Sequence, residues 1–324
     1  MKVASTTADG SRNLAAITAM VISMLIFSLS DVVMKLIGSR MPVGQLMLLR
    51  GIIATVLILA LAHATGVLAQ AHLMLQPKVL ARSLAEAICS VLYFVALMRM
   101  SLADVAAISQ FAPLAVMAGA ALILGEAVGW RRWTAAGVGF LGVLLIVKPG
   151  TSAFQPAALI MLASMLFVAI RDLFTRRLPA GLPTVLVTAA AIIAVMLTGA
   201  VMTPFETWHT PSRLEWALLL FSGVAVIGGF MLGIQALRSG DIAVVSPFRY
   251  SFVLFATLLS FAVFGEIPDG LGFAGVLFIV ASGLYSLHRE RIRRGEPPLT
   301  AAGSHGLMGG LRHRRTMAGK TEAP

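Results

Sequence analysis

Ten apolar runs of about twenty residues each take up most of this chain and leave only short connectors between them. A helix needs about 20 apolar residues to cross the hydrocarbon core of a bilayer. The two longest connectors, 64–78 and 204–213, have ordinary loop lengths. The sequence therefore predicts an all-α integral membrane protein with ten transmembrane helices and no separate soluble domain. The runs are 14–36, 43–63, 79–98, 103–125, 131–148, 155–175, 183–203, 214–236, 242–264 and 270–288.

The overall composition agrees with a membrane protein. Hydrophobic residues make up 58% of the chain and charged residues 12%, and the mean hydropathy is +0.91. A soluble domain carries about twice that share of charge. The first run contains Asp31 and Lys35 and is too long for a signal peptide, so we expect it to be the first span. Cys89 is the only cysteine and lies within a predicted span, where we expect it to pack as a small apolar residue.

The two halves of the chain repeat one pattern of charged residues. In each half an Asp near the end of one apolar run precedes a Gly-Glu pair that ends a later run. Asp31 and Glu126 are 95 residues apart, and Asp172 and Glu266 are 94 residues apart. Because five spans is an odd number, the second half enters the membrane from the opposite face. The sequence predicts two inverted repeats, an arrangement typical of secondary transporters with a site between the halves.

The predicted repeats cover 14–148 and 155–288, between a short N-terminus at 1–13 and a tail at 289–324. Ten spans place both ends of the chain on one side of the membrane. Segments on that side hold 16 basic residues and those on the other side hold four, so the rule that basic loops stay inside places both termini in the cytoplasm. The four outer basic residues are Arg40, Arg99, Lys148 and Arg213.

The net charge of +11 is explained by the basic segments on the cytoplasmic side. The tail at 289–324 is basic and poor in large apolar residues, so we expect it to be disordered and to contact anionic lipid of the inner leaflet. We expect no nucleic-acid partner, because aromatic residues do not alternate with these charges.

Several stretches resemble one family of membrane transporters. The chain is similar to the EamA-type members of the drug/metabolite transporter superfamily, which have ten spans in two repeats. The resemblance implies transport of small organic metabolites across the bacterial inner membrane, by import, export or exchange. It is carried by SLADVAAI at 101–108, GE at 125–126 followed by WRRW at 130–133, and GDIAVVSPFRY at 240–250.

The start of the chain narrows this resemblance. Residues 31–35, residues 42–45 and Arg50 resemble the opening of bacterial riboflavin and S-adenosylmethionine uptake carriers. We therefore expect uptake of riboflavin first and of S-adenosylmethionine second. Export of amino acids or amines is the competing hypothesis within the same class.

Two charged residues are expected near the outer ends of the first two spans. A charge inside a span costs at least a few kcal/mol, so it needs a partner, water or a route to the surface. Asp31 and Arg50 lie at similar depths and can pair, with Lys35 closer to the surface. This pair either fixes the two spans or serves as a gate or ligand site.

A second charged couple is expected deeper on the cytoplasmic side. Glu86 and Arg249 each lie about seven residues, or about 10 Å, into spans that begin at that face. We predict that Glu86 couples transport to protons or binds a ligand, with Arg249 as its counter-charge. The alternative is a local pair of Glu86 with Arg82, one helical turn earlier.

Polar and aromatic residues favour a cavity near Arg249. Gln110 and Tyr250 occupy matching positions of the two halves, and Pro113 and Pro247 interrupt their spans. Phe248 and Tyr250 can offer flat faces to a ring or a cation, although packing is the more common role of aromatic residues. The candidate substrate or coupling residues are Asp31, Arg50, Glu86, Gln110, Phe248, Arg249 and Tyr250.

Two other functional classes fit less well. A membrane-embedded enzyme would need a nucleophile with its base or a metal cluster, and the sequence shows neither motif. We therefore expect no catalytic residues, no metal and no cofactor. A channel would need rings of charge or carbonyl filters, whereas an inverted repeat suits alternating access. The oligomeric state stays open, and a homodimer is compatible with the sequence.

Overall fold

Helices form all the regular structure in the described part of the chain. In the computed structural model the described residues are 3–125, 130–148, 155–179, 181–239, 245–266 and 269–293. Glu126, residues 240–244 of the family motif and the tail from 294 onward lie outside them.

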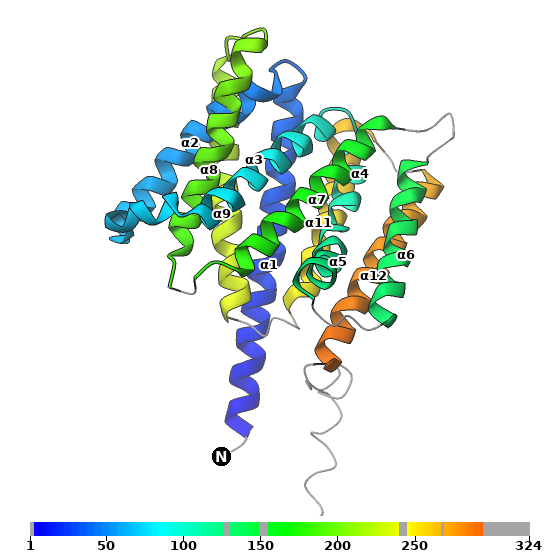
Figure 1. Ribbon diagram of the computed structural model, residues 1–324. Coiled ribbons are helices and arrows are strands. Elements are labelled where there is room, and N and C mark those ends of the chain that lie inside the picture. Colours follow the sequence, from blue (N-terminus) through cyan, green and yellow to red (C-terminus); the bar gives the residue numbers. More distant parts are fainter. Residues whose placement is uncertain are drawn as a thin grey trace, which may run out of the picture.

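The helices follow the predicted runs (Figure 1). Among the described residues, eight helical segments are long and apolar enough to cross a membrane, and two of these, Leu102–Ile123 and Pro247–Phe264, join shorter elements. Two shorter apolar helices, Trp133–Val147 and Gly270–Tyr285, coincide with the remaining two runs. The elements are α1 Val3–Gly38, α2 Val43–Ala64, η1 Val67–Leu75, α3 Pro77–Leu97, α4 Leu102–Ser109, α5 Ala112–Leu124, α6 Trp130–Val147, α7 Pro156–Arg176, α8 Thr184–Met202, η2 Thr203–Phe205, α9 Arg213–Ser239, η3 Ser246–Tyr250, α11 Ser251–Leu259, η4 Ser260–Phe264 and α12 Gly270–Arg293.

Two of the predicted spans are broken rather than continuous. The run at 103–125 divides into α4 and α5, with Gln110 and Phe111 between them and Pro113 in the first turn of α5. Within the run at 242–264, a 3₁₀ turn, η3, precedes α11, and η4 is a π-helical turn. Proline has no N–H to donate and disfavours helical geometry in the preceding residue, which explains why the α4–α5 break lies beside Pro113.

The helices pack in pairs that join distant parts of the chain. α1 lies along α9, α3 along α7, α2 along α8 and α6 along α12. α5 also packs on α7, and α11 on α1. We call the end of the bundle where α1 ends and α2 begins the distal end. The end where α3 begins and α7 ends is the proximal end.

The crossing of α6 and α12 depends on two glycines. A Cβ atom on Gly142 would lie 2.7 Å from the carbonyl oxygen of Gly275. A Cβ atom on Gly275 would lie 2.5 Å from the carbonyl oxygen of Gly142. No side chain fits at such distances, so glycine at both positions allows the two backbones to touch, as is common between helices in lipid.

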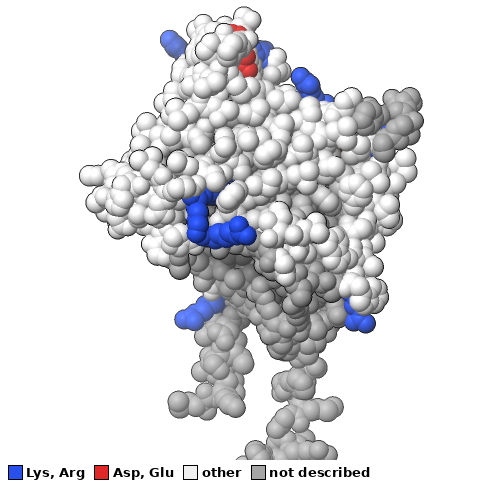
Figure 2. All heavy atoms as spheres, viewed as in Figure 1, with Lys and Arg blue, Asp and Glu red and all other residues white. Residues whose placement is uncertain are grey.

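Large apolar side chains are buried mainly at the distal end. Met34, Ile37, Leu46, Leu97 and Leu102 are all fully buried where α1, α2, α3 and α4 meet. Figure 2 shows that the described surface on one face is mostly uncharged, with only a few basic and acidic patches. Exposed large apolar residues are numerous, as expected where lipid replaces water around a bundle.

Candidate functional site

A cavity of about 670 Å³ lies inside the bundle. This volume is within the usual range for small-molecule sites. Its walls come from α1 to α5, α7 to α9, η3 and α11. The wall extends from Met47 and Phe94, toward the distal end, to Ala120 and Thr188 near the proximal end.

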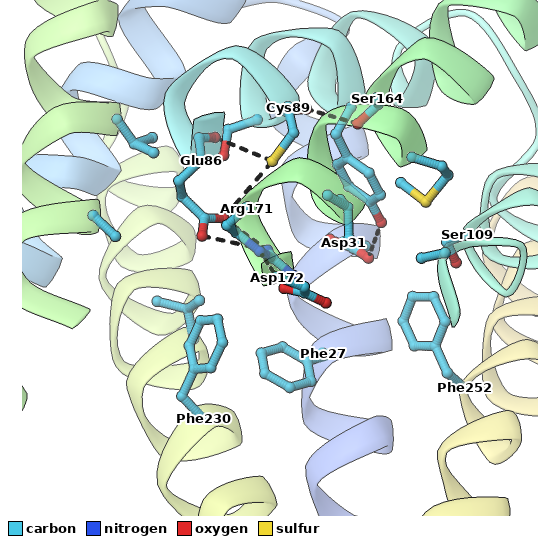
Figure 3. Close-up of a pocket in the computed structure, with 18 of the residues that line it drawn as sticks. Phe27, Asp31, Glu86, Cys89, Ser109, Ser164, Arg171, Asp172, Phe230 and Phe252 are labelled. Carbon is cyan, nitrogen blue, oxygen red and sulfur yellow. Dashed lines mark hydrogen bonds and ion pairs between the residues drawn. The ribbon is translucent and has the colours of Figure 1, made fainter. Parts of the chain in front are cut away.

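Charged side chains form a cluster in the proximal half of the cavity (Figure 3). Arg171 of α7 donates to both carboxylate oxygens of Glu86 on α3, at 3.1 and 3.3 Å. The same guanidinium donates from Nε to Oδ1 of Asp172, at 2.8 Å. Arg82 lies 3.3 Å from the second oxygen of Glu86. We call these four residues the proximal charge cluster, in which Arg171 links α7 to α3.

Arg249 is not the direct partner of Glu86 that the sequence suggested. Arg171 holds that position because α7 packs along the length of α3. The alternative local pair of Glu86 with Arg82 is present. Arg249 instead extends from η3, which packs on α1 and α12, and it makes no hydrogen bond or ion pair with any described residue.

A second polar group lies deeper in the cavity. The hydroxyl of Tyr93 donates to Oδ2 of Asp31 at 2.6 Å. Arg50 donates to Ser30 at 3.5 Å, and its guanidinium lies 5.4 Å from the centre of the Phe94 ring. Asp31 and Arg50 therefore lie near each other on the cavity wall, but the direct acceptor–donor contact of Asp31 is with Tyr93.

Tyr93 was not among the residues that the sequence analysis singled out. It lies on the cavity wall, because α3 turns this side toward α1. Cys89 also lines the cavity, and Ser164 donates to its backbone carbonyl at 2.8 Å, which ties α7 to α3 a second time.

A different ion pair lies at the distal end. Lys35 of α1 donates to both carboxylate oxygens of Glu266, at 2.8 and 2.9 Å, and to the carbonyl oxygen of Met100 at 2.8 Å. Ser260 donates to Glu266 at 2.8 Å. None of these four residues lines the cavity. Lys148 and Asp269 form a further ion pair between the chain after α6 and the start of α12.

The matching family accounts for nearly all the described chain. Residues 14–148 and 155–287 each match the model of the EamA-like transporter family. The chain belongs to this family. The resemblance inferred from the sequence is thereby confirmed, and the protein is a multi-pass membrane protein of a transporter family rather than of an enzyme family.

Relatives of this EamA-family protein are named for different substrates. An S-adenosylmethionine uptake transporter of Rickettsia prowazekii (strain Madrid E) is 27% identical over 183 residues, which are 55% of this chain and 60% of that protein. A pseudopaline exporter of Pseudomonas aeruginosa (strain UCBPP-PA14) is 28% identical over 269 residues, which are 81% of this chain and 92% of the exporter. A riboflavin transporter of Vibrio cholerae serotype O1 is 28% identical over 184 residues, covering 54% and 59%.

A solved crystal structure shares the fold of this EamA-family protein. The two superpose with a TM-score of 0.60 at 21% sequence identity, covering 89% of this chain and 99% of the other. An identity this low relates the folds alone.

The cavity brings together most of the residues that the sequence singled out in this EamA-family protein. Six of the seven line it, and Phe248 does not. Sequence reasoning did not assign a site role to Arg171, although its position beside Asp172 near the end of an apolar run was a visible signal. The six lining residues are Asp31, Arg50, Glu86, Gln110, Arg249 and Tyr250.

Proposed function

We propose that this protein is a secondary carrier that moves a small organic metabolite across a bacterial inner membrane by alternating access. The observation that carries the proposal is the cavity of about 670 Å³, which has charged walls inside an otherwise apolar bundle. Charges inside a membrane protein are costly and usually mark the pathway of a substrate or ion. The ion pair of Lys35 with Glu266 and the buried apolar side chains around it favour a state closed at the distal end.

The proposal includes ten spans arranged as two inverted repeats, 14–148 and 155–288. If each of the first five spans is exchanged with its counterpart five spans later, α1 corresponds to α7 and α3 corresponds to α9. The contact of α1 with α9 then becomes the contact of α7 with α3. The same exchange turns α5–α7 into α11–α1, and it leaves α2–α8 and α6–α12 unchanged. The reciprocal contact of Gly142 and Gly275 is what a twofold axis through that crossing would produce.

We further propose that both termini, 1–13 and 289–324, are cytoplasmic, with the basic tail against anionic lipid. Reporter fusions test this topology directly. Fusions after Lys148 and Asp269 should report the periplasm, and a fusion after Arg177 should report the cytoplasm. A cytoplasmic signal after Lys148 would contradict the inverted repeat.

Riboflavin and S-adenosylmethionine are the substrate candidates to test first. Phe27, Phe230 and Phe252 line the cavity and can flank a flat ring, which supports riboflavin or the adenine of S-adenosylmethionine. The charged walls favour the second candidate, because they offer partners for charged groups. Proteoliposomes containing the purified protein should show saturable counterflow of one of the two labelled compounds. Flux that rises linearly with concentration would argue for a channel instead.

Proton coupling is assigned in this proposal to Asp31 or Glu86. Glu86 is held between two arginines, whereas the hydrogen bond to Asp31 comes from the neutral hydroxyl of Tyr93. We therefore expect Asp31→Asn to remove the response of uptake to an imposed pH gradient while counterflow persists. A variant that still responds to the gradient would assign coupling elsewhere.

A further inference from the structure

The charges on the cavity wall do not balance within the protein. Among the described residues the wall carries four arginines and three carboxylates. Each carboxylate already accepts a hydrogen bond from a neighbour: Asp31 from Tyr93, and both Glu86 and Asp172 from Arg171. Among the described residues, two of the four arginines therefore form no ion pair with a carboxylate. The arginines are Arg50, Arg82, Arg171 and Arg249.

Arg249 is the wall arginine with no direct partner among the residues that the structure describes. Arg82 and Arg171 are ion-paired with Glu86, and Arg50 contacts Ser30 and the ring of Phe94. The side chain of Arg249 is exposed to the open space of the cavity. A guanidinium stays protonated in proteins, so it cannot relieve the cost of its position by losing its charge. Its location calls for an anion supplied from outside the protein.

Asp172 faces the same space from another element. One of its carboxylate oxygens accepts the bond from Arg171, and its side chain remains 41% exposed. Asp172 and Arg249 are near enough to interact electrostatically. No nitrogen of the Arg249 guanidinium lies within 4.0 Å of a carboxylate oxygen of Asp172, so the two side chains do not form an ion pair. A positive and a negative group thus face the cavity with a gap between them.

We infer that Arg249 and Asp172 bind the two charged groups of an α-amino acid substrate, an inference that rests on the proposed carrier function. Arg249 donates to the carboxylate of the ligand, and Asp172 accepts from its ammonium group. The two ligand groups are attached to one carbon atom, so they can meet opposite charges that are close but not in contact. The rest of the cavity, walled by Phe27, Phe230 and Phe252, takes the side chain. Riboflavin has neither group, so this subsite selects S-adenosylmethionine among the two candidates.

Binding to the purified, detergent-solubilised protein tests the subsite separately from transport. The probes for calorimetry are S-adenosylmethionine, its two analogues that lack the carboxylate or the amine, the twenty protein amino acids and riboflavin. We expect Arg249→Gln to weaken binding of the best amino acid by at least about tenfold, since a charge-assisted pair is lost. The decarboxylated analogue should bind the native protein weakly and should lose nothing further in Arg249→Gln. Asp172→Asn should weaken binding of the amino acid. It should leave unchanged the affinity for the analogue that keeps the carboxylate but lacks the amine.

The controls separate a specific subsite from a general effect of charge. Arg40→Gln removes an exposed arginine that does not line the cavity, and it should bind like the native protein. Arg249→Lys keeps the charge and should recover part of the affinity. Equal losses of the amino acid and its decarboxylated analogue in Arg249→Gln would overturn the inference. Failure of every amino acid to bind would also overturn it, while saturable riboflavin counterflow in proteoliposomes of the same purified protein would leave the carrier function standing.

Discussion

The two ends of the bundle both contain ion pairs, but they use them differently. At the distal end Lys35 and Glu266 are joined at 2.8 Å outside the cavity, and Ser260 and the carbonyl of Met100 complete their hydrogen bonds. In the proximal half, Arg171 holds Glu86 and Asp172 on the cavity wall itself.

The difference lies in what surrounds the charges. The distal pair contacts the carbonyl oxygen of buried Met100, and Lys35 lies over the ring of Phe264, so the pair is satisfied by protein groups alone. The proximal charge cluster borders open space, and nearby Arg249 lacks an ion-pair partner among the described residues. The Lys35–Glu266 pair needs no further partner, so it suits closure of the distal end. Arg249 has a charge that no described side chain neutralises, so the proximal half of the cavity suits binding of a ligand.

Removing Glu86 should have the largest effect, because it takes the shared carboxylate from two arginines. In Glu86→Gln the charges of Arg82 and Arg171 lose that partner. The side chains of Glu86 and Arg171 are 15% and 21% exposed, so the cost should be about 2 kcal/mol, less than for a fully buried pair. Uptake in proteoliposomes should fall by more than about tenfold, with a lower Tm.

The double variant Glu86→Gln/Arg171→Gln is the matched control for this pair. Losing both charges is expected to cost less stability than losing one, because no charge is left stranded. The Tm of the double variant should therefore lie above that of Glu86→Gln. Normal uptake by Glu86→Gln would return this residue to a purely structural role.

Removing the hydroxyl of Tyr93 should have the next largest effect. Tyr93→Phe keeps the ring and deletes the donor that lies 2.6 Å from Asp31. Hydrogen bonds to charged groups contribute about 1.5 kcal/mol or more, so we expect a rise of about tenfold in the KM of uptake. Tyr285→Phe, which changes an exposed tyrosine outside the cavity, serves as control. An unchanged KM in Tyr93→Phe would show that Asp31 does not depend on this bond.

Several of these residues could be predicted from the sequence, for one physical reason. A charge in a span must avoid lipid, so Asp31, Arg50, Glu86 and Arg249 were expected to face the interior, and all four lie on the cavity wall. The helical character of the chain followed from the length of the apolar runs in the same way. Both predictions depend only on the free-energy cost of placing a charged or polar group in the hydrocarbon of the membrane.

Partner choice could not be predicted, because it depends on which helices pack together. Arg171 meets Glu86 only because α7 lies along α3, and Tyr93 meets Asp31 only because α3 turns that face inward. Phe248 was expected to face the cavity but does not line it, although the next two residues, Arg249 and Tyr250, do. In the 3₁₀ turn η3, successive side chains point in different directions, so neighbours in sequence need not share a face.

Unlocking the distal end should have a smaller effect than either change in the cavity. Lys35→Met strands the carboxylate of Glu266, which is 33% exposed and still bonded to Ser260, so closure should weaken by only about 1 kcal/mol. A cysteine introduced at Met47, on the cavity wall, reports this opening in a Cys89→Ser background. Labelling by a membrane-impermeant maleimide should be about fivefold faster than with Lys35 present. An unchanged labelling rate would mean that the distal pair does not hold the cavity closed.

The exposed pair of Lys148 with Asp269 should matter least, and its effect should depend on pH. The hydrogen bond from Lys148, with that from the backbone N–H of Gly272, holds the pKa of Asp269 below its usual value. Asp269 is 57% exposed, so the pair contributes no more than about 0.5 kcal/mol. Asp269→Asn keeps a good helix cap for α12 and removes only the charge.

The direction of the pH effect follows from that lowered pKa. A carboxylate whose pKa is lower in the folded protein stabilises the fold above its unfolded pKa of about 3.9. The benefit is lost as the pH falls through the folded value. Asp269→Asn should therefore lower the Tm slightly at pH 7, and this effect should vanish as the pH falls through the lowered pKa of Asp269. A difference in Tm that persists or grows on acidification would show that the effect of Asp269→Asn does not come from the lost pairing with Lys148.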